Sequence, residues 1–181
     1  MLDDIKKVGI VGLGYVGLPV AVGFSKKYDV IGFDIDKGKI ESLNRNDDPT
    51  GQFSKETLKN CSIKFVSDAQ ALKTCNFIIV TVPTPITKSS EPDLTYLKEA
   101  SFLIGKHLSK ETTIIYESTV YPGTTEDICI PILEETTGMT AGVDFYVGYS
   151  PERINPGDKE HTFQTTTKIV SGQNDEVLNR I

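Results

Sequence analysis

A glycine-rich segment near the N-terminus has the spacing of a phosphate-binding loop. The run G-L-G-Y-V-G that begins at Gly12 is a G-x-G-x-x-G pattern between an expected strand and an expected helix. Gly12 permits the tight turn, Gly14 lets the backbone approach a pyrophosphate, and Gly17 allows the helix to pack closely on the strand. Helix N-termini present free N–H groups to phosphates, so we expect Tyr15 and Val16 to bind through their backbones. The side chain of Val16 is instead expected to pack.

A carboxylate stands where a ribose-binding residue is needed. Asp34 ends the second expected strand, about 20 positions past the loop, where it would accept hydrogen bonds from the adenosine ribose. A carboxylate there would repel a 2′-phosphate, which favours NAD over NADP as the cofactor. Lys37 and Lys39 lie close by and weaken this preference. Lys39 is a candidate cofactor contact, although both lysines could belong to a solvated helix face, and Asp34 could be an ordinary helix N-cap.

These residues need a framework that brings the strand ends together. The chain alternates short β-branched runs with longer helical stretches, which indicates βαβ units and an α/β fold of the Rossmann type. That fold is a doubly wound, mostly parallel sheet with helices on both faces. The expected strands are 7–11, 29–33, 63–66, 77–81, 112–116, 145–149 and 168–171. The expected helices are 16–27, 36–44, 67–72, 93–108, 175–181 and 123–137, the last one interrupted at Pro131.

The whole chain, residues 1–181, is predicted to form one NAD-binding Rossmann domain. The helix that starts at Asp175 would stop after about two turns, at about 3.6 residues a turn. Natural domains rarely end so abruptly, so we expect that the chain is an N-terminal fragment of a longer protein. The alternative is a short terminal helix.

Composition and charge exclude several classes of protein. The net charge of -6 gives no basic footprint for nucleic acid or an anionic membrane. No apolar run approaches the roughly 20 residues of a membrane span, and the charged N-terminus is not a secretory signal. Cys61, Cys75 and Cys129 form no CxxC pair, which fits a reducing, cytoplasmic setting and small buried side chains. His107 and His161 lack metal-ligand partners at useful spacing, so no metal is expected.

Four segments together have the order and spacing of one enzyme family. They read GLGYVGLP at 12–19, VPTP at 82–85, ESTVYPGT at 117–124 and SPERINPG at 150–157. These segments resemble those of the UDP-glucose/GDP-mannose dehydrogenase family. The resemblance extends over nearly the whole chain. The resemblance is closest to the bacterial branch that acts on UDP-N-acetylhexosamines, UDP-GlcNAc or UDP-GalNAc, for capsule and O-antigen polysaccharides. The segment at 150–157 is its most specific signal.

The resemblance implies an NAD-dependent double oxidation. The sugar C6 alcohol becomes an aldehyde and then a carboxylate, and two NAD are reduced. Family members trap the aldehyde on a cysteine thiolate as a thiohemiacetal, and an activated water hydrolyses the resulting thioester. No segment here resembles the Gly-rich segment that carries that cysteine, so we expect the thiol and its lysine to lie beyond residue 181. The resemblance also implies that the central helix and the UDP-sugar-binding domain are absent from residues 1–181, so the chain is expected to be inactive alone.

The resemblance also assigns roles to residues. Thr119 matches a threonine that orders the water or the substrate hydroxyl near the nicotinamide, and Glu152 matches the general base for thioester hydrolysis. Glu152 is also expected to contact the substrate, together with Arg153 and Asn155. The alternatives are that Ser118 or Thr119 caps the following helix and that Glu152 is a glutamate of a surface loop.

Residues after the fourth expected strand should line the ribose and nicotinamide side of the cofactor. Val82 and Thr84 are the candidates there, with Ser118 and Thr119 from the next strand end, because ligands bind outside the carboxyl ends of such strands. Pro156 stands where some family members carry a second glutamate, which points toward the acetamido-sugar branch.

Other functions remain open from the sequence. UDP-glucose or GDP-mannose could be the substrate in place of a UDP-N-acetylhexosamine. A β-hydroxyacid or 6-phosphogluconate type dehydrogenase shares the opening loop but lacks the SPER segment. A stand-alone NAD-binding regulatory module would be favoured by a complete chain ending near residue 181. The expected partners are a UDP-sugar and, for the full-length enzyme, a second copy in a homodimer or larger assembly.

Overall fold

A computed structural model describes residues 4–152 and 166–181 of the chain. Within these ranges one seven-stranded sheet has the order β3-β2-β1-β4-β5-β6-β7. The first six strands pair in parallel, and β7 pairs with β6 in the antiparallel sense. The Rossmann-type prediction is confirmed. The strands are β1 (Lys7–Val11), β2 (Asp29–Phe33), β3 (Ile63–Val66), β4 (Phe77–Val80), β5 (Thr113–Tyr116), β6 (Tyr146–Tyr149) and β7 (Ser171–Gly172).

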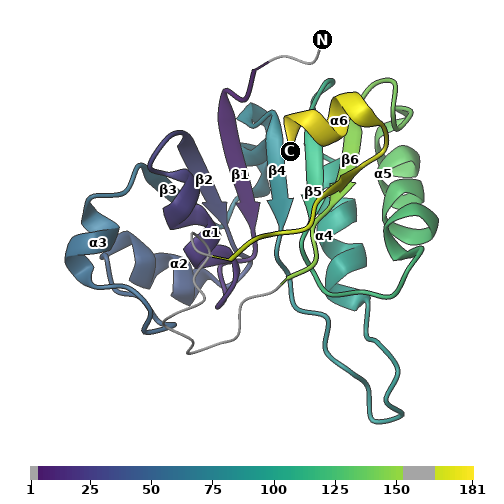
Figure 1. Cartoon of the computed structure of the whole chain (residues 1–181). Coiled ribbons are helices and arrows are strands. Elements are labelled where there is room, and N and C mark those ends of the chain that lie inside the picture. The colour runs from purple at the N-terminus through teal and green to yellow at the C-terminus, as the bar shows by residue number, and fades with distance from the viewer. Residues whose placement is uncertain (1–3, 153–165) are drawn as a thin grey trace.

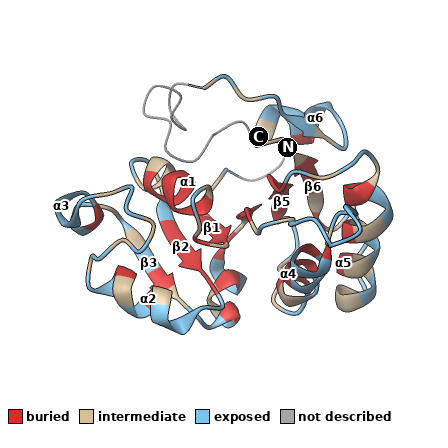
Figure 2. Ribbon diagram, turned by 90° about the horizontal axis from the view of Figure 1, so that it is seen from below, coloured by how far each residue is buried: buried red, intermediate tan, exposed pale blue. Residues whose placement is uncertain are grey.

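Helices cover both faces of this sheet, as the alternating strand pattern predicts. Val8 and Ile10 of β1 pack on one face with α1 and α2, whereas Val11 packs on the other face with α4 and α5. The buried residues lie in the central strands and on the inner helix faces (Figure 2). The helices are α1 (Gly17–Phe24), α2 (Lys37–Asn44), α3 (Lys55–Lys59), α4 (Thr95–Gly105), α5 (Ile130–Thr137) and α6 (Asp175–Arg180), with a 3₁₀ helix at Ala69–Thr74 and a π-helix at Thr125–Cys129.

The helix expected over 123–137 divides into two parts. A π-helical turn over Thr125–Cys129 leads into α5, and Pro131 is at the start of α5. Proline has no N–H, so it cannot donate to the carbonyl four residues earlier, and a wider turn accommodates the missing bond. The predicted interruption of the helix is confirmed. Pro131, its cause, is the second residue of α5.

Two other expectations about elements are wrong. The sequence predicts a strand over 168–171, but β7 spans only Ser171–Gly172. Ile169 and Val170 are exposed, so these β-branched residues do not belong to the core. The short helix α3 was not predicted. Ser54 caps it by accepting a hydrogen bond from the N–H of Thr57 at 3.1 Å.

The carboxyl ends of the parallel strands meet at one edge of the sheet. The glycine-rich loop leaves β1 at this edge, and the long loop between β4 and α4 extends beyond it (Figure 1). That loop is closed near its base by a β-bridge between Ile86 and Pro92. None of the helices in the described ranges is long and apolar enough to cross a membrane.

Candidate functional site

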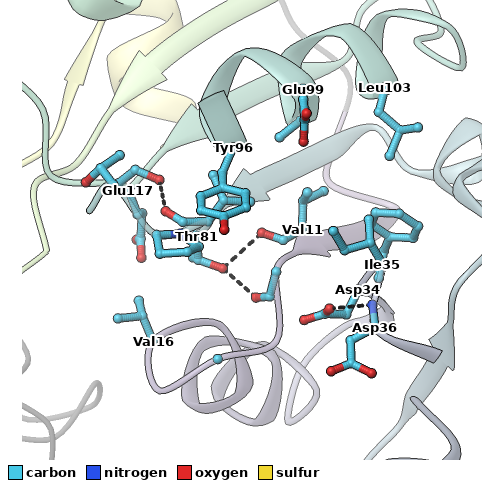
Figure 3. Close-up of a pocket in the computed structure, with 18 of the residues that line it drawn as sticks. Val11, Val16, Asp34, Ile35, Asp36, Thr81, Tyr96, Glu99, Leu103 and Glu117 are labelled. Atoms are coloured by element: carbon cyan, nitrogen blue, oxygen red, sulfur yellow. Dashed lines mark hydrogen bonds between the residues drawn. The ribbon is translucent and has the colours of Figure 1, made fainter. Parts of the chain in front are cut away.

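A cavity of about 830 Å³ opens at the edge where the parallel strands end. Residues from β1, β2, the β4–α4 connection, the segment after β5 and α4 line it. In Figure 3, Glu117 and Asp36 lie at opposite ends of the cavity, with Tyr96 and Glu99 on α4 above it and Val16 below. Such edges are where open α/β sheets bind ligands.

The loop after β1 is held by a residue that the sequence analysis did not single out. The hydroxyl of Thr81, directly after β4, donates to the carbonyl oxygens of Gly12 at 2.7 Å and of Val11 at 3.1 Å. Gly12 has φ 94°, a conformation that favours glycine, and its N–H donates to Phe33 at 2.8 Å. The turn is therefore held by hydrogen bonds to β2 and to the residue directly after β4.

The other two loop glycines meet different surroundings. A Cβ on Gly17 would collide with the carbonyl oxygen of Gly12 and with the Thr81 hydroxyl, whereas a Cβ on Gly14 would meet nothing within 4 Å. Tyr15 is 52% exposed, and Val16 packs against the core beside α1. Among the described residues none accepts the backbone N–H groups of Gly14, Tyr15 or Val16, as is usual at a helix start.

Asp34 directly follows β2 and lines the cavity. It is buried and accepts hydrogen bonds from the N–H of Leu13 at 2.8 Å and of Asp36 at 2.9 Å. The N-cap of α2 is Asp36, so the capping alternative for Asp34 is wrong. The ammonium of Lys39 lies 2.6 Å from the Asp34 carboxylate, so Lys39 does not belong to a purely solvated face.

Replacing Asp34 with asparagine should change the choice of cofactor. The variant loses the charge that opposes a 2′-phosphate but keeps the Lys39 ammonium beside it. We expect the ratio of NADP to NAD affinity to rise at least tenfold, or about 1.4 kcal/mol. Fluorescence titration with NADH and NADPH measures this ratio. Asp29→Asn, at the other end of β2, should leave it unchanged, and an unaltered ratio in the Asp34 variant would argue against this role.

The ends of β4 and β5 are joined by two side-chain hydrogen bonds. The Ser118 hydroxyl donates to the carbonyl of Val82, and the Thr84 hydroxyl donates to the carbonyl of Thr119, each at 2.6 Å. All four residues line the cavity. The next helical segment begins at Thr125 with Thr124 at the N-cap position, so the capping alternative for Ser118 and Thr119 is wrong.

Glu152 lies in the cavity wall beside a second carboxylate. Its side chain is 11% exposed, so the surface-loop alternative is wrong. The Lys168 ammonium is 2.8 Å from Glu117 Oε1 and 3.8 Å from Glu152 Oε2. Burial raises the pKa of Glu117, the Lys168 charge lowers it, and the Glu152 charge raises it. Arg153 and Asn155, the other expected substrate contacts, lie outside the described residues.

None of the three cysteines, all of which are described, lines the cavity. Cys75 and Cys129 are buried, and burial raises the pKa of each thiol to about 11, which keeps both as neutral thiols near pH 7. The half-buried Cys61 donates to the carbonyl of Thr57. A nucleophile needs the thiolate, so Cys75 and Cys129 are poorly suited to attack an aldehyde.

Several residues at the cavity were not predicted. The contributions of α4 come from side chains three and four positions apart, a spacing that marks one helix face. Glu117 is the first residue of the ESTVYPGT segment, but the resemblance assigns it no role, and the sequence predicts Lys168 only as part of a strand. Among those missed are Thr81, Tyr96, Glu99, Leu103 and Glu117, which line the cavity, and Lys168, which is bonded to Glu117.

The strand order, the glycine-rich loop and the carboxylate at the end of β2 define a Rossmann-type dinucleotide-binding domain. The chain belongs to the UDP-glucose/GDP-mannose dehydrogenase family. The model of the NAD binding domain of that family matches residues 6–181, which identifies NAD as the cofactor of the domain.

Individual relatives agree with this assignment. The chain is 55% identical to Protein CapL of Staphylococcus aureus and 52% identical to UDP-N-acetyl-D-glucosamine 6-dehydrogenase of Pseudomonas aeruginosa, over 96% and 94% of its length and 41% of theirs. An NDP-N-acetyl-D-galactosaminuronic acid dehydrogenase from Methanosarcina mazei superposes with a TM-score of 0.88 at 31% identity, over 98% of this chain and 41% of that one. The chain thus spans less than half the length of these relatives.

Proposed function

We propose that the chain is the NAD-binding part of a UDP-N-acetylhexosamine 6-dehydrogenase that serves bacterial capsule or O-antigen synthesis. The observation that carries the proposal is the half-buried Glu152 carboxylate, which shares the cavity with Thr119 and the glycine-rich loop. Relatives named UDP-N-acetyl-D-glucosamine 6-dehydrogenase are 48% and 52% identical to the chain, whereas those named GDP-mannose 6-dehydrogenase are 31% to 33% identical. This difference favours an acetamido sugar over GDP-mannose.

The residues at the cavity fit NAD. The open space at Gly14 leaves room for a pyrophosphate beside the N–H groups of Tyr15 and Val16. Asp34 and Lys39 would hold the adenosine ribose. Bound NAD supplies the acceptor for each hydride. Val82, Thr84, Ser118 and Thr119 would line the ribose and nicotinamide side.

Two residues of the chain would handle protons. The Thr119 hydroxyl would orient the reacting alcohol or water, since a hydroxyl both donates and accepts a hydrogen bond. The Glu152 carboxylate would take a proton from the water that completes the second oxidation. Arg153 and Asn155 would contact the UDP-sugar, and the full-length enzyme would be a homodimer or a larger assembly.

An NADH-release assay of the full-length enzyme tests the proposed function. UDP-GlcNAc, UDP-GalNAc, UDP-glucose and GDP-mannose are compared at equal concentration. We expect two NADH per sugar consumed and the highest kcat/KM with one of the two acetamido sugars. Preference for UDP-glucose or GDP-mannose would overturn the substrate class. NAD binding without turnover of any of the four would favour a regulatory module.

The 181-residue chain should not complete the double oxidation of any of these sugars, even at saturating NAD. The second hydride transfer needs a thiolate at the cavity to trap the aldehyde, and Cys75 and Cys129 are buried away from it. Absorbance at the NADH band, followed over hours at high protein concentration and compared with the sugar consumed, provides the measurement. Two NADH per sugar from the chain alone would show that the nucleophile lies within it.

A further inference from the structure

Three charged side chains from separate segments meet at one end of the cavity. Glu117 directly follows β5, where its N–H donates to the carbonyl of Val80 at 2.8 Å. The N–H of Ser150 donates to the carbonyl of Tyr116 at 3.0 Å, which places Glu152 just past the neighbouring end of β6. Lys168 precedes β7, the strand that returns antiparallel to β6. The sheet itself therefore brings Glu117, Glu152 and Lys168 together.

The contacts of Lys168 with the two carboxylates are unequal. Its ammonium is 2.8 Å from Glu117, a charge-assisted hydrogen bond, but 3.8 Å from Glu152, an ion pair without a short bond. The side chains of Glu117, Glu152 and Lys168 are 6%, 11% and 15% exposed. Both carboxylates line the cavity and Lys168 does not, so the ammonium bridges them from behind the wall.

Stability alone does not explain this arrangement. Burying an ion pair costs desolvation that its attraction often fails to repay, and here a second carboxylate adds repulsion. Burial raises the pKa of Glu117 in spite of the adjacent Lys168, and the Glu152 charge raises it further. The cluster therefore holds charges in an unfavourable place at the wall of the binding cavity, which is a frequent property of functional sites.

We propose that Glu117 and Lys168 are positioning residues for the Glu152 carboxylate. Lys168 holds that carboxylate toward the cavity, and Glu117 takes the short bond of the ammonium. A carboxylate that shared a 2.8 Å bond with lysine would be a poor proton acceptor, because the ion pair favours its charged form. At 3.8 Å the Lys168 ammonium can orient Glu152 without a short hydrogen bond between the two side chains. This inference rests on the proposed function, in which Glu152 is the base.

Other charged groups of the described chain come from different walls of the cavity. Asp34, Asp36 and Lys39 belong to the end of β2 and to α2, and Glu99 belongs to α4. In Figure 3, Asp34 and Asp36 lie across the cavity from Glu117. Charge changes at Glu152 and Lys168 should therefore dominate the titration of Glu117.

The titration of the Glu117 carboxyl carbon in the ¹³C-labelled 181-residue chain tests the coupling. Glu152→Gln removes a repelling charge and should lower the pKa of Glu117, whereas Lys168→Met removes an attracting one and should raise it. In Lys168→Arg, which keeps the positive charge, the pKa of Glu117 should lie closer to the wild-type value than in Lys168→Met. Lys110→Met breaks an exposed ion pair with Asp144 and should leave it unchanged.

Absence of these shifts would overturn the inference. If Lys168→Met fails to fold, the Glu117 titrations of the other two variants still test the coupling. Lys168→Arg keeps a positive charge beside both carboxylates, and Glu152→Gln replaces one carboxylate with a neutral amide of the same size. An unchanged Glu117 titration in Glu152→Gln would show that the two carboxylates are not coupled.

The catalytic consequence is measured in the full-length enzyme. Glu117→Gln removes the negative charge that competes with Glu152 for the Lys168 ammonium, so the acid limb of kcat/KM should move to lower pH and kcat should fall about tenfold, while KM for NAD changes less than twofold. An unmoved pH profile would contradict the positioning role. If the wild-type enzyme makes no NADH from any nucleotide sugar, the proposed function fails, and the Glu117 titration still decides whether the cluster is coupled.

Discussion

Replacing Gly14 with alanine is expected to abolish NAD binding and leave the domain folded. The added methyl group would meet no protein atom within 4 Å, so the free energy of unfolding should change by less than about 1 kcal/mol, the usual difference between glycine and alanine. The same methyl group would occupy the space that a pyrophosphate needs beside the helix N-terminus. Calorimetry should show an affinity at least 100-fold lower, or about 2.7 kcal/mol.

Two other glycines provide matched comparisons. Gly17→Ala should lose stability as well as binding, by about 2 to 4 kcal/mol, because the methyl group collides with Gly12 and Thr81. Gly38→Ala, in α2, should keep both properties. Normal NAD affinity in Gly14→Ala would show that the cofactor does not approach this loop.

Replacing Glu152 with glutamine should lower kcat of the full-length enzyme by about 10² to 10⁴, the usual contribution of a general base. Glutamine keeps the size of the side chain but cannot accept the proton from water. Because hydrolysis follows both hydride transfers, rapid mixing should show a burst of NADH before slow turnover. KM for NAD should stay within about twofold.

The NADH burst distinguishes a role of Glu152 in hydrolysis from a role in the alcohol oxidation. A variant that forms no NADH even in the first turnover would place Glu152 in the alcohol oxidation instead. Glu135→Gln on the exposed side of α5 is the control for charge removal and should turn over normally. Slow turnover in both variants would indicate a general electrostatic effect.

Local patterns were enough to predict the half of the site built on β1 and β2. The strands Lys7–Val11, Asp29–Phe33 and Ile63–Val66 have the predicted bounds, and in β1 and β2 the four residues after the first are all buried, which is typical of strands covered on both faces. Asp34 follows the loop at a fixed distance within one βαβ unit, so spacing alone indicated its place. Lys39 lies in the first turn of α2, close to Asp34 in sequence, so the same spacing argument indicated it as a candidate cofactor contact.

The other half of the site depends on contacts that spacing cannot reveal. Glu117 and Lys168 are 51 positions apart and meet only because β7 returns antiparallel to β6. Tyr96 and Glu99 reach the cavity because α4 packs over the sheet edge, which its sequence does not specify. Thr81 acts on the glycine-rich loop across the β1–β4 pairing.

Backbone amide shifts of the ¹⁵N-labelled wild-type chain, recorded during an NAD titration, test whether the cavity at the strand ends is the cofactor site. We predict saturable shifts at segment 12–17, at Asp34, and after β4 and β5, with a Kd of about 10 µM to 1 mM, or roughly -7 to -4 kcal/mol. The amides of β3 and α3 should not respond. No shifts at millimolar NAD, or shifts confined to residues away from the cavity, would contradict this assignment.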